Sequence, residues 1–481
     1  MGIYVTIAAM PNPIRVLFLA AEADPFVKVG GLGDVSAALS RALRSLPDSQ
    51  LDVRLALPHH GVIKANARPL EMFPMRYGDR EVTVQVSETS VDGMPVYLIG
   101  GEPIAAVGSV YSSNPALDAE KYSFFSLAAL QLPRILNWEM NILHAHDWHT
   151  ALAVYALLLK RWDGEMRGVS SVLTLHNLPY MGGDVTEILK SYSLPVAQTD
   201  LPDWAHALPL PLGLFAADAV VAVSPTYRDE ILTERFGCGL QDFLHRRKET
   251  LYGILNGIDT LAYDPATDEA IPFQYTAENP SIREKNKAAL QTKLGLEAGP
   301  LIPVFGMVTR MDKQKGVDSA LEVLRKLDDL PWQFVILGTG DPELEEQART
   351  LQKDMPMRVR VESRFDAKLA RQIYAGADML LMPSRYEPCG LAQMIAMRYG
   401  CIPIVHATGG LSDTVNNSNG FLFKTDTPRA FRGAILKALT AFSDRDAWIA
   451  RQKNAMQTDF SWGRSAQTYF ELYQSLLNKK P

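Results

Sequence analysis

The sequence has few cysteines, no excess of basic residues and no long apolar run. Only three of its 481 residues are cysteine, Cys238, Cys389 and Cys401, and their spacing matches no metal site. So few cysteines, odd in number, indicate a reducing compartment and argue against a disulfide framework. The 48 Lys and Arg residues are outnumbered by 54 Asp and Glu residues, for a net charge of −6. This is a poor match for a nucleic-acid-binding protein, which normally has a basic face. No apolar run reaches the length of about 18 residues that indicates a membrane span.

Several catalytic signatures are also missing. The sequence contains no GxSxG elbow, no GxxxxGK[ST] loop and no HExxH helix, which argues against several classes of hydrolase and NTPase. Residues 1–10 are apolar but lack the basic residues of a signal peptide, so we interpret them as a tail or an edge strand. We therefore expect a soluble cytoplasmic protein. The composition, 47% hydrophobic and 21% charged, is that of an ordinary globular chain.

The chain is longer than the roughly 250–300 residues at which single cores stop growing, so we expect more than one domain. Strand-like and helical segments alternate, which is typical of parallel sheets covered by helices. The segment 265–283 is rich in Pro, Thr and acidic residues and is the predicted linker. We predict an α/β fold with two Rossmann-like doubly wound domains, at 1–264 and 284–455, and a final helix within 456–481. The strands are expected at 14–21, 82–86, 96–99, 142–146, 172–176, 219–224, 302–308, 333–337, 358–362, 379–383 and 402–406. The helices are expected at 34–46, 122–136, from 150, and at 316–327, 342–353, 367–376 and 390–399.

Ligands of such folds bind at the carboxyl ends of the strands, so the residues that directly follow strands are the candidates. The first group is Lys28 with Gly30, Gly31, Gly33 and Asp34. Glycines let backbone N–H groups approach a phosphate at a helix N-terminus, and the lysine adds a charge. A tight turn with a solvated lysine explains the spacing equally well, and the dinucleotide fingerprint GxGxxG is absent.

A second group, residues 144–149, reads His-Ala-His-Asp-Trp-His directly after a strand. Three histidines suggest a metal site, but polar residues that line a cleft are the interpretation we favour. Asp147 is also well placed to cap the following helix. His176 follows the next strand, so the two segments are expected to line one cleft.

The second half of the chain has three such segments. Arg310, Lys313 and Lys315 cluster between a strand and a helix and suit a diphosphate, although a solvated basic turn is the alternative. Glu387 precedes a helix expected from Gly390 and could accept hydrogen bonds from sugar hydroxyls or only cap the helix. The third segment, Thr408-Gly409-Gly410, is a further glycine turn.

Two short motifs suggest other functions and are weak. Asp444-Arg445-Asp446 has the Asp-x-Asp pattern of a metal-dependent sugar-nucleotide site, but in a charged stretch it is better explained as helix capping. Gly338-Thr339-Gly340 begins a dinucleotide fingerprint, but Glu343 stands at the third glycine position, which argues against an oxidoreductase.

Taken together, the segments resemble the bacterial glycogen synthase and plant starch synthase family of retaining glucosyltransferases. The resemblance covers residues 14–473. It is carried by KVGGLGDV (28–35), HAHDWHT (144–150), LTLHNLPYMG (173–182), AVSPTYRDEI (222–231), ILNGID (254–259), TRMDKQKG (309–316), PSRYEPCGLAQ (383–393) and TGGLSDTV (408–415). Eight motifs in the family's order make the resemblance specific.

This resemblance implies a GT-B architecture with the active site in the cleft between two domains and a C-terminal helix that crosses back to the first. It implies transfer of glucose from ADP-glucose to the non-reducing end of an α-1,4-glucan, glycogen or a malto-oligosaccharide, with retention of configuration. No metal, cofactor, nucleic acid or membrane is implied, and the oligomeric state is left open. The residues that match the family's catalytic positions are Lys28, Asp147, His176, Arg310, Lys315 and Glu387. Those that match substrate-binding positions are Gly30, Gly31, Asp34, Asn256, Cys389, Gly390, Leu391, Thr408, Gly409 and Gly410.

The sequence departs from the family's pattern in the segment 181–195, in the lysine missing near Leu210, and in Ala392, which replaces a threonine. These changes leave the expected donor site intact and concern the acceptor and loop closure. Two alternatives remain open. The donor could be UDP-glucose, because ADP and UDP share the diphosphate. The chain could also be a glucan-binding paralogue of low activity, although the six matched catalytic residues argue against it.

Overall fold

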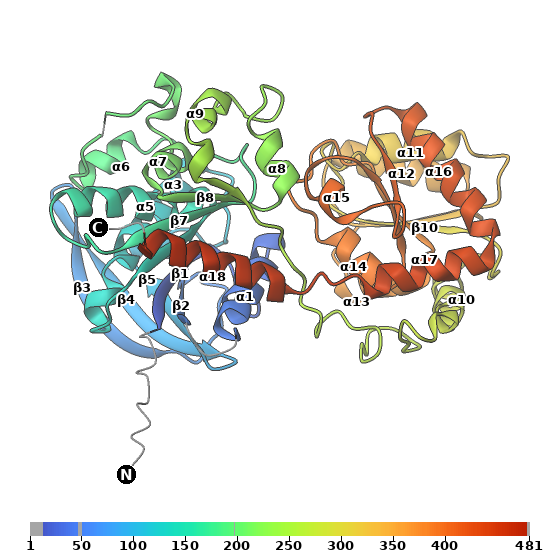
Figure 1. Cartoon of the computed structure of the whole chain (residues 1–481), viewed down its shortest axis with the longest axis horizontal. Helices are drawn as coiled ribbons and strands as arrows, with labels where there is room; N and C mark the ends of the chain where they lie inside the picture. Colours follow the sequence, from blue (N-terminus) through green and yellow to red (C-terminus); the bar gives the residue numbers. More distant parts are fainter. Residues whose placement is uncertain (1–12, 47–50, 197, 479–481) are drawn as a thin grey trace, which may run out of the picture. The chain divides into compact units, whose positions relative to one another are not determined.

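The computed structural model describes residues 13–46, 51–196 and 198–478; the tail predicted for residues 1–10 lies outside them. The chain forms two compact units. Unit 1 comprises residues 1–223, 228–254 and 462–481, and unit 2 comprises 224–227 and 255–461. The segment 265–283, predicted as a linker, belongs to unit 2 in this division. The C-terminal helix α18 (Trp462–Asn478) belongs to unit 1, where it packs along α1 (Gly31–Arg44) (Figure 1). No helix among the described residues is long and apolar enough to cross a membrane.

Unit 1 is built on a nine-stranded sheet of order β3-β4-β5-β2-β1-β6-β7-β8-β9. The strands from β5 to β9 along this order are parallel, and β3 and β4 form an antiparallel hairpin added at the β5 edge. The bounds are β1 (Ile14–Leu19), β2 (Leu51–Pro58), β3 (Arg68–Tyr77), β4 (Arg80–Val91), β5 (Met94–Gly100), β6 (Ile142–His146), β7 (Ser170–Leu175), β8 (Ala219–Ala222) and β9 (Leu251–Gly253).

Burial follows the two kinds of strand. All residues of β6 and β7 are buried, as expected where helices cover both faces of a parallel sheet. Strand β4 instead alternates buried Val82, Val84 and Val86 with exposed residues, because one face of the hairpin meets solvent. The helices of unit 1, besides α1 and α18, are α2 (Glu102–Ala105), α3 (Pro115–Ala129), α4 (Leu132–Ile135), α5 (Asp147–Trp162), α6 (Thr186–Ser191), α7 (Pro209–Ala216) and α9 (Gln241–Arg246); α8 (Pro225–Glu230) spans the division between the units.

Unit 2 has a six-stranded parallel sheet of order β12-β11-β10-β13-β14-β15. Its strands are β10 (Val304–Val308), β11 (Gln333–Leu337), β12 (Val359–Glu362), β13 (Met379–Met382), β14 (Ile402–His406) and β15 (Phe421–Phe423). Its helices are α10 (Arg283–Lys293), α11 (Val317–Arg325), α12 (Pro342–Asp354), α13 (Ala367–Gly376), α14 (Ala392–Arg398), α15 (Gly409–Thr414), α16 (Pro428–Ser443) and α17 (Arg445–Gln457). The side chain of Asp444 accepts from Ala447 N at the start of α17, which confirms the capping interpretation of the Asp-x-Asp motif.

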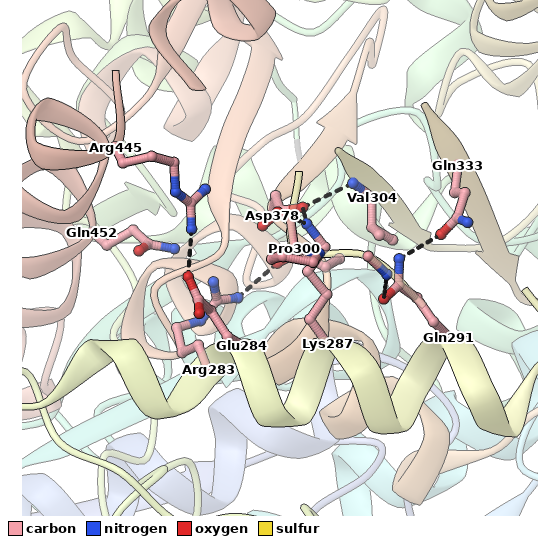
Figure 2. A network of polar contacts seen from close by, with 12 residues as sticks. Arg283, Glu284, Lys287, Gln291, Pro300, Val304, Gln333, Asp378, Arg445 and Gln452 are labelled. Atoms are coloured by element: carbon pink, nitrogen blue, oxygen red, sulfur yellow. Dashed lines mark hydrogen bonds and ion pairs between the residues drawn. The ribbon is translucent and has the colours of Figure 1, made fainter. Parts of the chain in front are cut away.

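Helix α10 joins the amino-terminal edge of this sheet through buried charges (Figure 2). Lys287 forms an ion pair of 2.7 Å with Asp378, whose carboxylate also accepts from Val304 N, the first residue of β10. Both side chains are about 95% buried, at 4% and 6% exposure. Arg283 donates to the carbonyls of Tyr374 and Ala377 at the end of α13 and of Tyr399 after α14. These contacts fix the end of the sheet opposite the candidate site.

Several predicted elements begin or end elsewhere. The helix expected from Asp34 begins at Gly31, so the glycines of the loop form its first turn. The helix expected at 122–136 is two helices, because α3 begins at Pro115 behind the Asn114 cap and ends at Ala129. Strand β2 and the long hairpin strand β3 were not predicted. The predicted strands 142–146, 333–337 and 402–406 and the helix 367–376 are confirmed residue for residue.

Candidate functional site

The predicted site residues fall into two groups, one at the carboxyl edge of each sheet. In unit 1, Lys28 follows β1 and Asp147 follows β6, the two neighbouring strands at which the strand order changes direction. In unit 2, Lys315 follows β10 and Glu387 follows β13, which are again the neighbours at the change of direction. Such switch points are where doubly wound sheets bind ligands. Both groups are therefore placed as binding sites would be.

The glycine loop of unit 1 is held by a carboxylate that sequence reasoning missed. Glu22, 1% exposed, accepts hydrogen bonds from the backbone N–H groups of Val29 and Gly30 and from the hydroxyl of Tyr111 at 2.7 Å. A Cβ on Gly33 would lie 3.1 Å from the Glu22 carboxylate, so glycine permits this close packing. The N–H of Gly30, predicted as a phosphate donor, is thus already used by Glu22. Its position in the sequence indicates a site residue, since Glu22 directly follows an apolar strand.

Lys28 and Asp34 lie together at this loop. The lysine ammonium is 2.6 Å from the Asp34 carboxylate, and both side chains are about one-third exposed. Gly30 caps α1 in an extended conformation and Gly31 is the first residue of the helix. The cation is therefore set beside a helix N-terminus, a combination that favours an anionic ligand.

Asp147 does not cap the helix that it begins. Its Oδ1 accepts instead from the backbone N–H groups of His176, at 2.7 Å, and Asn177, at 3.3 Å, which follow the next strand. The residue has a left-handed φ of 53°, and its side chain is almost fully buried. The capping interpretation was wrong because the carboxylate turns across the sheet edge toward β7, so that it ties the two strand ends together.

Burial raises the pKa of Asp147 to about 7, and the hydrogen bonds from His176 and Asn177 oppose the rise. The same burial lowers the pKa of His176 to about 3. Perturbed carboxyl and imidazole groups at a strand edge are typical of functional sites.

We expect the Asp147→Asn variant to gain stability relative to the wild type as pH rises. Between pH 3.8 and about 7, the folded chain holds a proton at Asp147 that the unfolded chain has lost. The contribution of Asp147 to the free energy of unfolding therefore falls with rising pH through this window, and the variant lacks this contribution. Urea unfolding from about pH 4 to about pH 8 measures the difference, which should grow up to about pH 7 and then stay constant. A difference independent of pH would contradict the raised pKa.

The three histidines of residues 144–149 lie in two places. The rings of His144 and His146 stack, with centroids 4.4 Å apart, whereas the ring of His149 packs on Tyr111 and Tyr122. No three His, Cys, Asp or Glu side chains come together as metal ligands within residues 13–46, 51–196 and 198–478. His146 Nδ1 lies 2.9 Å from Nε2 of His176.

In unit 2, Lys315 and Glu387 form the centre of the second group. The lysine ammonium lies 2.8 and 2.7 Å from the two carboxylate oxygens, and Ser384 Oγ donates to one of them at 3.0 Å. The Glu387 side chain is 6% exposed. Arg310 lies at the end of β10 with its side chain 59% exposed, beside Asp312 at 3.4 Å. A pocket of about 190 Å³ is lined by Thr309, Arg310, Lys315, Ser384, Glu387 and Gly390, among others. Helix capping therefore does not explain Glu387, since its carboxylate is bound by Lys315 and Ser384.

A larger open pocket, of about 760 Å³, lies in unit 1 beside Arg15 and Asn141. These residues are at the amino ends of β1 and β6, the edge opposite the one where parallel sheets bind ligands. Position therefore favours the smaller pocket of unit 2 as the candidate site.

The remaining predicted residues surround Glu387. Cys389 is buried, which raises the pKa of its thiol to about 12, and a backbone hydrogen bond from Asn256 opposes this rise. The Asn256 side chain is also buried, and none of the described residues hydrogen-bonds to its Oδ1. Gly390 and Leu391 line the pocket. Thr408 precedes α15, in which Gly409 and Gly410 are the first two residues.

The glycines of unit 2 allow three loops to meet. A Cβ on Gly316 would lie 2.1 Å from the carbonyl oxygen of Pro383, one on Gly409 would lie 2.0 Å from that of Glu387, and one on Gly410 would lie 2.2 Å from that of Cys389. The N–H of Gly410 donates to the carbonyl of Glu387 at 3.1 Å. The loops after β10, β13 and β14 therefore pack backbone to backbone, which holds the Glu387 segment in place.

We expect Gly409→Ala to lower the free energy of unfolding by about 1–3 kcal/mol, because the new Cβ would displace the Glu387 backbone and φ is +44°. Gly433→Ala is the matched control, since no described atom apart from its chain neighbours and its own helix backbone lies within 4 Å of its Cβ position in α16. That variant should gain about 0.5–1 kcal/mol from helix propensity. Urea unfolding of both variants measures the contrast, and equal effects would contradict the packing argument.

Known proteins and family models match this chain over most of its length. A family model described as the starch synthase catalytic domain matches residues 15–246, and one described as glycosyl transferases group 1 matches residues 299–455. A glycogen synthase of Anaeromyxobacter sp. (strain Fw109-5) is 40% identical over 96% of this chain and 99% of its own length. A glycogen synthase of Bacillus cereus (strain B4264) is 38% identical over 96% of this chain and its full length.

Solved structures of two glycosyltransferases are also similar to this chain. The catalytic domain of starch synthase IV from Arabidopsis thaliana, bound to ADP and acarbose, has a TM-score of 0.89 and 32% identity, and covers 97% of this chain and 100% of its own. Sucrose-phosphate synthase from Thermosynechococcus elongatus has a TM-score of 0.64 and 18% identity, and covers 97% of this chain and 100% of its own. The common fold is the GT-B glycosyltransferase fold of two α/β domains. The chain belongs to the glycogen and starch synthase family of glycosyltransferases.

Proposed function

We propose that this protein transfers glucose from ADP-glucose to the non-reducing end of an α-1,4-glucan, with retention of configuration and without a metal or resident cofactor. The observation that carries the proposal is the Lys315–Glu387–Ser384 cluster at the switch point of the unit 2 sheet, beside the exposed Arg310. It combines cations for a diphosphate with a buried carboxylate for sugar hydroxyls. Starch synthase IV, which has ADP in its solved structure, supports the adenine nucleotide.

In the proposed reaction, the bond between C1 of glucose and the diphosphate oxygen breaks, and a new bond forms between C1 and the acceptor hydroxyl. The proton of that hydroxyl passes to the leaving phosphate on the same face of the sugar, which retains the configuration. Arg310 and Lys315 stabilise the negative charge that develops on the diphosphate, the role that a metal ion has in other transferases. The helix N-termini that follow β10 and β13 favour the same charge.

The surroundings of Glu387 support a positioning role for this carboxylate over a role as covalent nucleophile. Lys315 contacts both of its oxygens and Ser384 donates to one. A carboxylate neutralised in this way is a weak nucleophile but a well-oriented hydrogen-bond acceptor. In unit 1, we propose that Lys28 and Asp34 act at the donor, and that Asp147 and His176 hold the transferred glucose and the acceptor.

Glucose incorporation into glycogen from radiolabelled ADP-glucose and UDP-glucose, measured in parallel with and without EDTA, tests the proposal. We expect turnover with ADP-glucose that is unaffected by EDTA and lost in Glu387→Ala. A preference for UDP-glucose would overturn the donor assignment and leave the site. Glucan binding without transfer from either donor would instead indicate a binding paralogue.

A further inference from the structure

A buried polar column connects the C-terminal helix of unit 1 to His176. We call it the histidine column; it consists of His144, His146, His176, Thr174, Tyr469 and Tyr473. His144 is fully buried and has partners at both ring nitrogens, the Tyr473 hydroxyl at Nδ1 and Thr174 Oγ1 at Nε2, each at 2.7 Å. Thr174 Oγ1 in turn lies 3.2 Å from the Tyr469 hydroxyl. Helix α18 supplies both tyrosines, so this helix helps to fix the His144 ring.

His146 is the second member of the column and is also fully buried. Its ring stacks on His144 and packs on Phe18, with centroids 4.4 and 4.3 Å away. Nδ1 lies 2.9 Å from Nε2 of His176, whereas no described residue hydrogen-bonds to Nε2. One ring nitrogen therefore has a polar partner, and the other has none among the described residues.

The hydrogen bond between His146 and His176 requires a proton on one of its two nitrogens. If neutral His146 were protonated at Nε2, a buried N–H would have no acceptor among the described residues, which costs about 1–3 kcal/mol. If it is protonated at Nδ1, only a lone pair remains unpaired, which is tolerated better than an unpaired N–H. Nδ1 of His146 therefore donates and Nε2 of His176 accepts. A neutral imidazole that accepts at Nε2 carries its own proton at Nδ1.

We propose that His146 is a positioning residue that holds His176 as the neutral Nδ1–H tautomer, so that His176 presents a hydrogen-bond donor to the sugar substrate. The role toward a sugar rests on the proposed function, whereas the tautomer does not. His176 is the member that is only half-buried, at the carboxyl end of β7. Burial lowers the pKa of His176 to about 3 and that of His146 well below its ordinary value, which is consistent with two neutral rings.

The tautomer can be measured without any substrate. The nine histidines of the full chain are labelled with ¹⁵N, and long-range ¹H–¹⁵N correlation spectra show which nitrogen of each ring carries the proton. The signals of His176 are assigned from their loss in His176→Gln. We expect His176 in the Nδ1–H form and neutral at about pH 7. The Nε2–H form, or a protonated ring at that pH, would overturn the proposal.

Three variants test whether His146 fixes the tautomer of His176. His146→Leu removes the donor, and we expect His176 to lose its single tautomer and kcat/KM to fall about 10-fold or more, as is usual when a supporting partner is removed. His146→Asn keeps an N–H near the position of Nδ1 and should retain the tautomer. Tyr473→Phe removes a hydroxyl from the same column without touching this hydrogen bond and should also leave the tautomer unchanged. An unchanged tautomer in His146→Leu would overturn the proposal. The expected tautomers together with no glucosyl transfer would contradict only the proposed function.

Discussion

Replacing Lys315 by methionine is expected to lower kcat/KM for glucosyl transfer by about 10²- to 10³-fold, a loss typical for a group that stabilises developing charge. The substitution removes a cation proposed to contact the leaving diphosphate. It also leaves the buried Glu387 carboxylate without the ammonium that lies 2.7 and 2.8 Å from its oxygens. We expect kcat to fall more than KM rises, because the charge on the diphosphate increases as the bond to C1 breaks.

Lys326→Met is the matched control for this variant. Lys326 also forms an ion pair, at 2.7 Å with Glu322, but its side chain is 63% exposed. Such surface pairs contribute about 0–1 kcal/mol, and the control should keep activity within about twofold of the wild type. Initial rates at several ADP-glucose concentrations measure both variants. If Lys315→Met resembled the control, the cluster in unit 2 would not be the donor site.

Lys287→Met is expected to lower the free energy of unfolding of unit 2 by about 3–5 kcal/mol. The loss arises because Asp378, 6% exposed, would remain as a buried carboxylate without its cation. Among the residues that the structure describes, its remaining hydrogen-bond donor would be the N–H of Val304. The double variant Lys287→Met/Asp378→Asn removes both charges, and we expect it to recover most of the loss. Urea unfolding followed by circular dichroism measures each variant.

The control for this pair is Lys353→Met. Its side chain is 73% exposed and lies 3.5 Å from Glu346, so we expect a change within about 0.5 kcal/mol. A single variant as stable as this control would mean that the buried pair contributes little. A double variant no more stable than the single one would show that packing of the lysine stem, not the unpaired charge, causes the loss.

Much of the candidate site was visible in the sequence because its residues directly follow apolar strands. This position singles out Asp147, His176, Arg310 and Glu387 without any coordinates. The same position also singles out Glu22, which was not among the predicted site residues. The partners of these residues could not be predicted in the same way. The pairing of Lys315 with Glu387 joins residues 72 positions apart, and no local pattern records that contact.

The glycines also show the difference between what the sequence indicates and what only the structure shows. The glycines of the loop at 30–33 are predicted to let backbone N–H groups approach a phosphate, and Gly409 and Gly410 to form a further turn, but the structure gives several glycines another reason. Gly316, Gly409 and Gly410 press against the backbone of the loop that follows β13, and Gly33 presses against Glu22. The sequence shows where a side chain is absent, whereas only the packing shows which atoms occupy that space.

The sequence by itself determined the fold class, the alternation of strands and helices, and the family, because these follow from local periodicity and short motifs. Tertiary structure decided the order of the strands, and with it the two switch points at β1/β6 and β10/β13. It decided that the Asp147 carboxylate binds the β7 end and does not cap its helix, and that His146 faces His176. Each of these depends on which strands become neighbours, and that choice is made by long-range burial of the sheets between their helices.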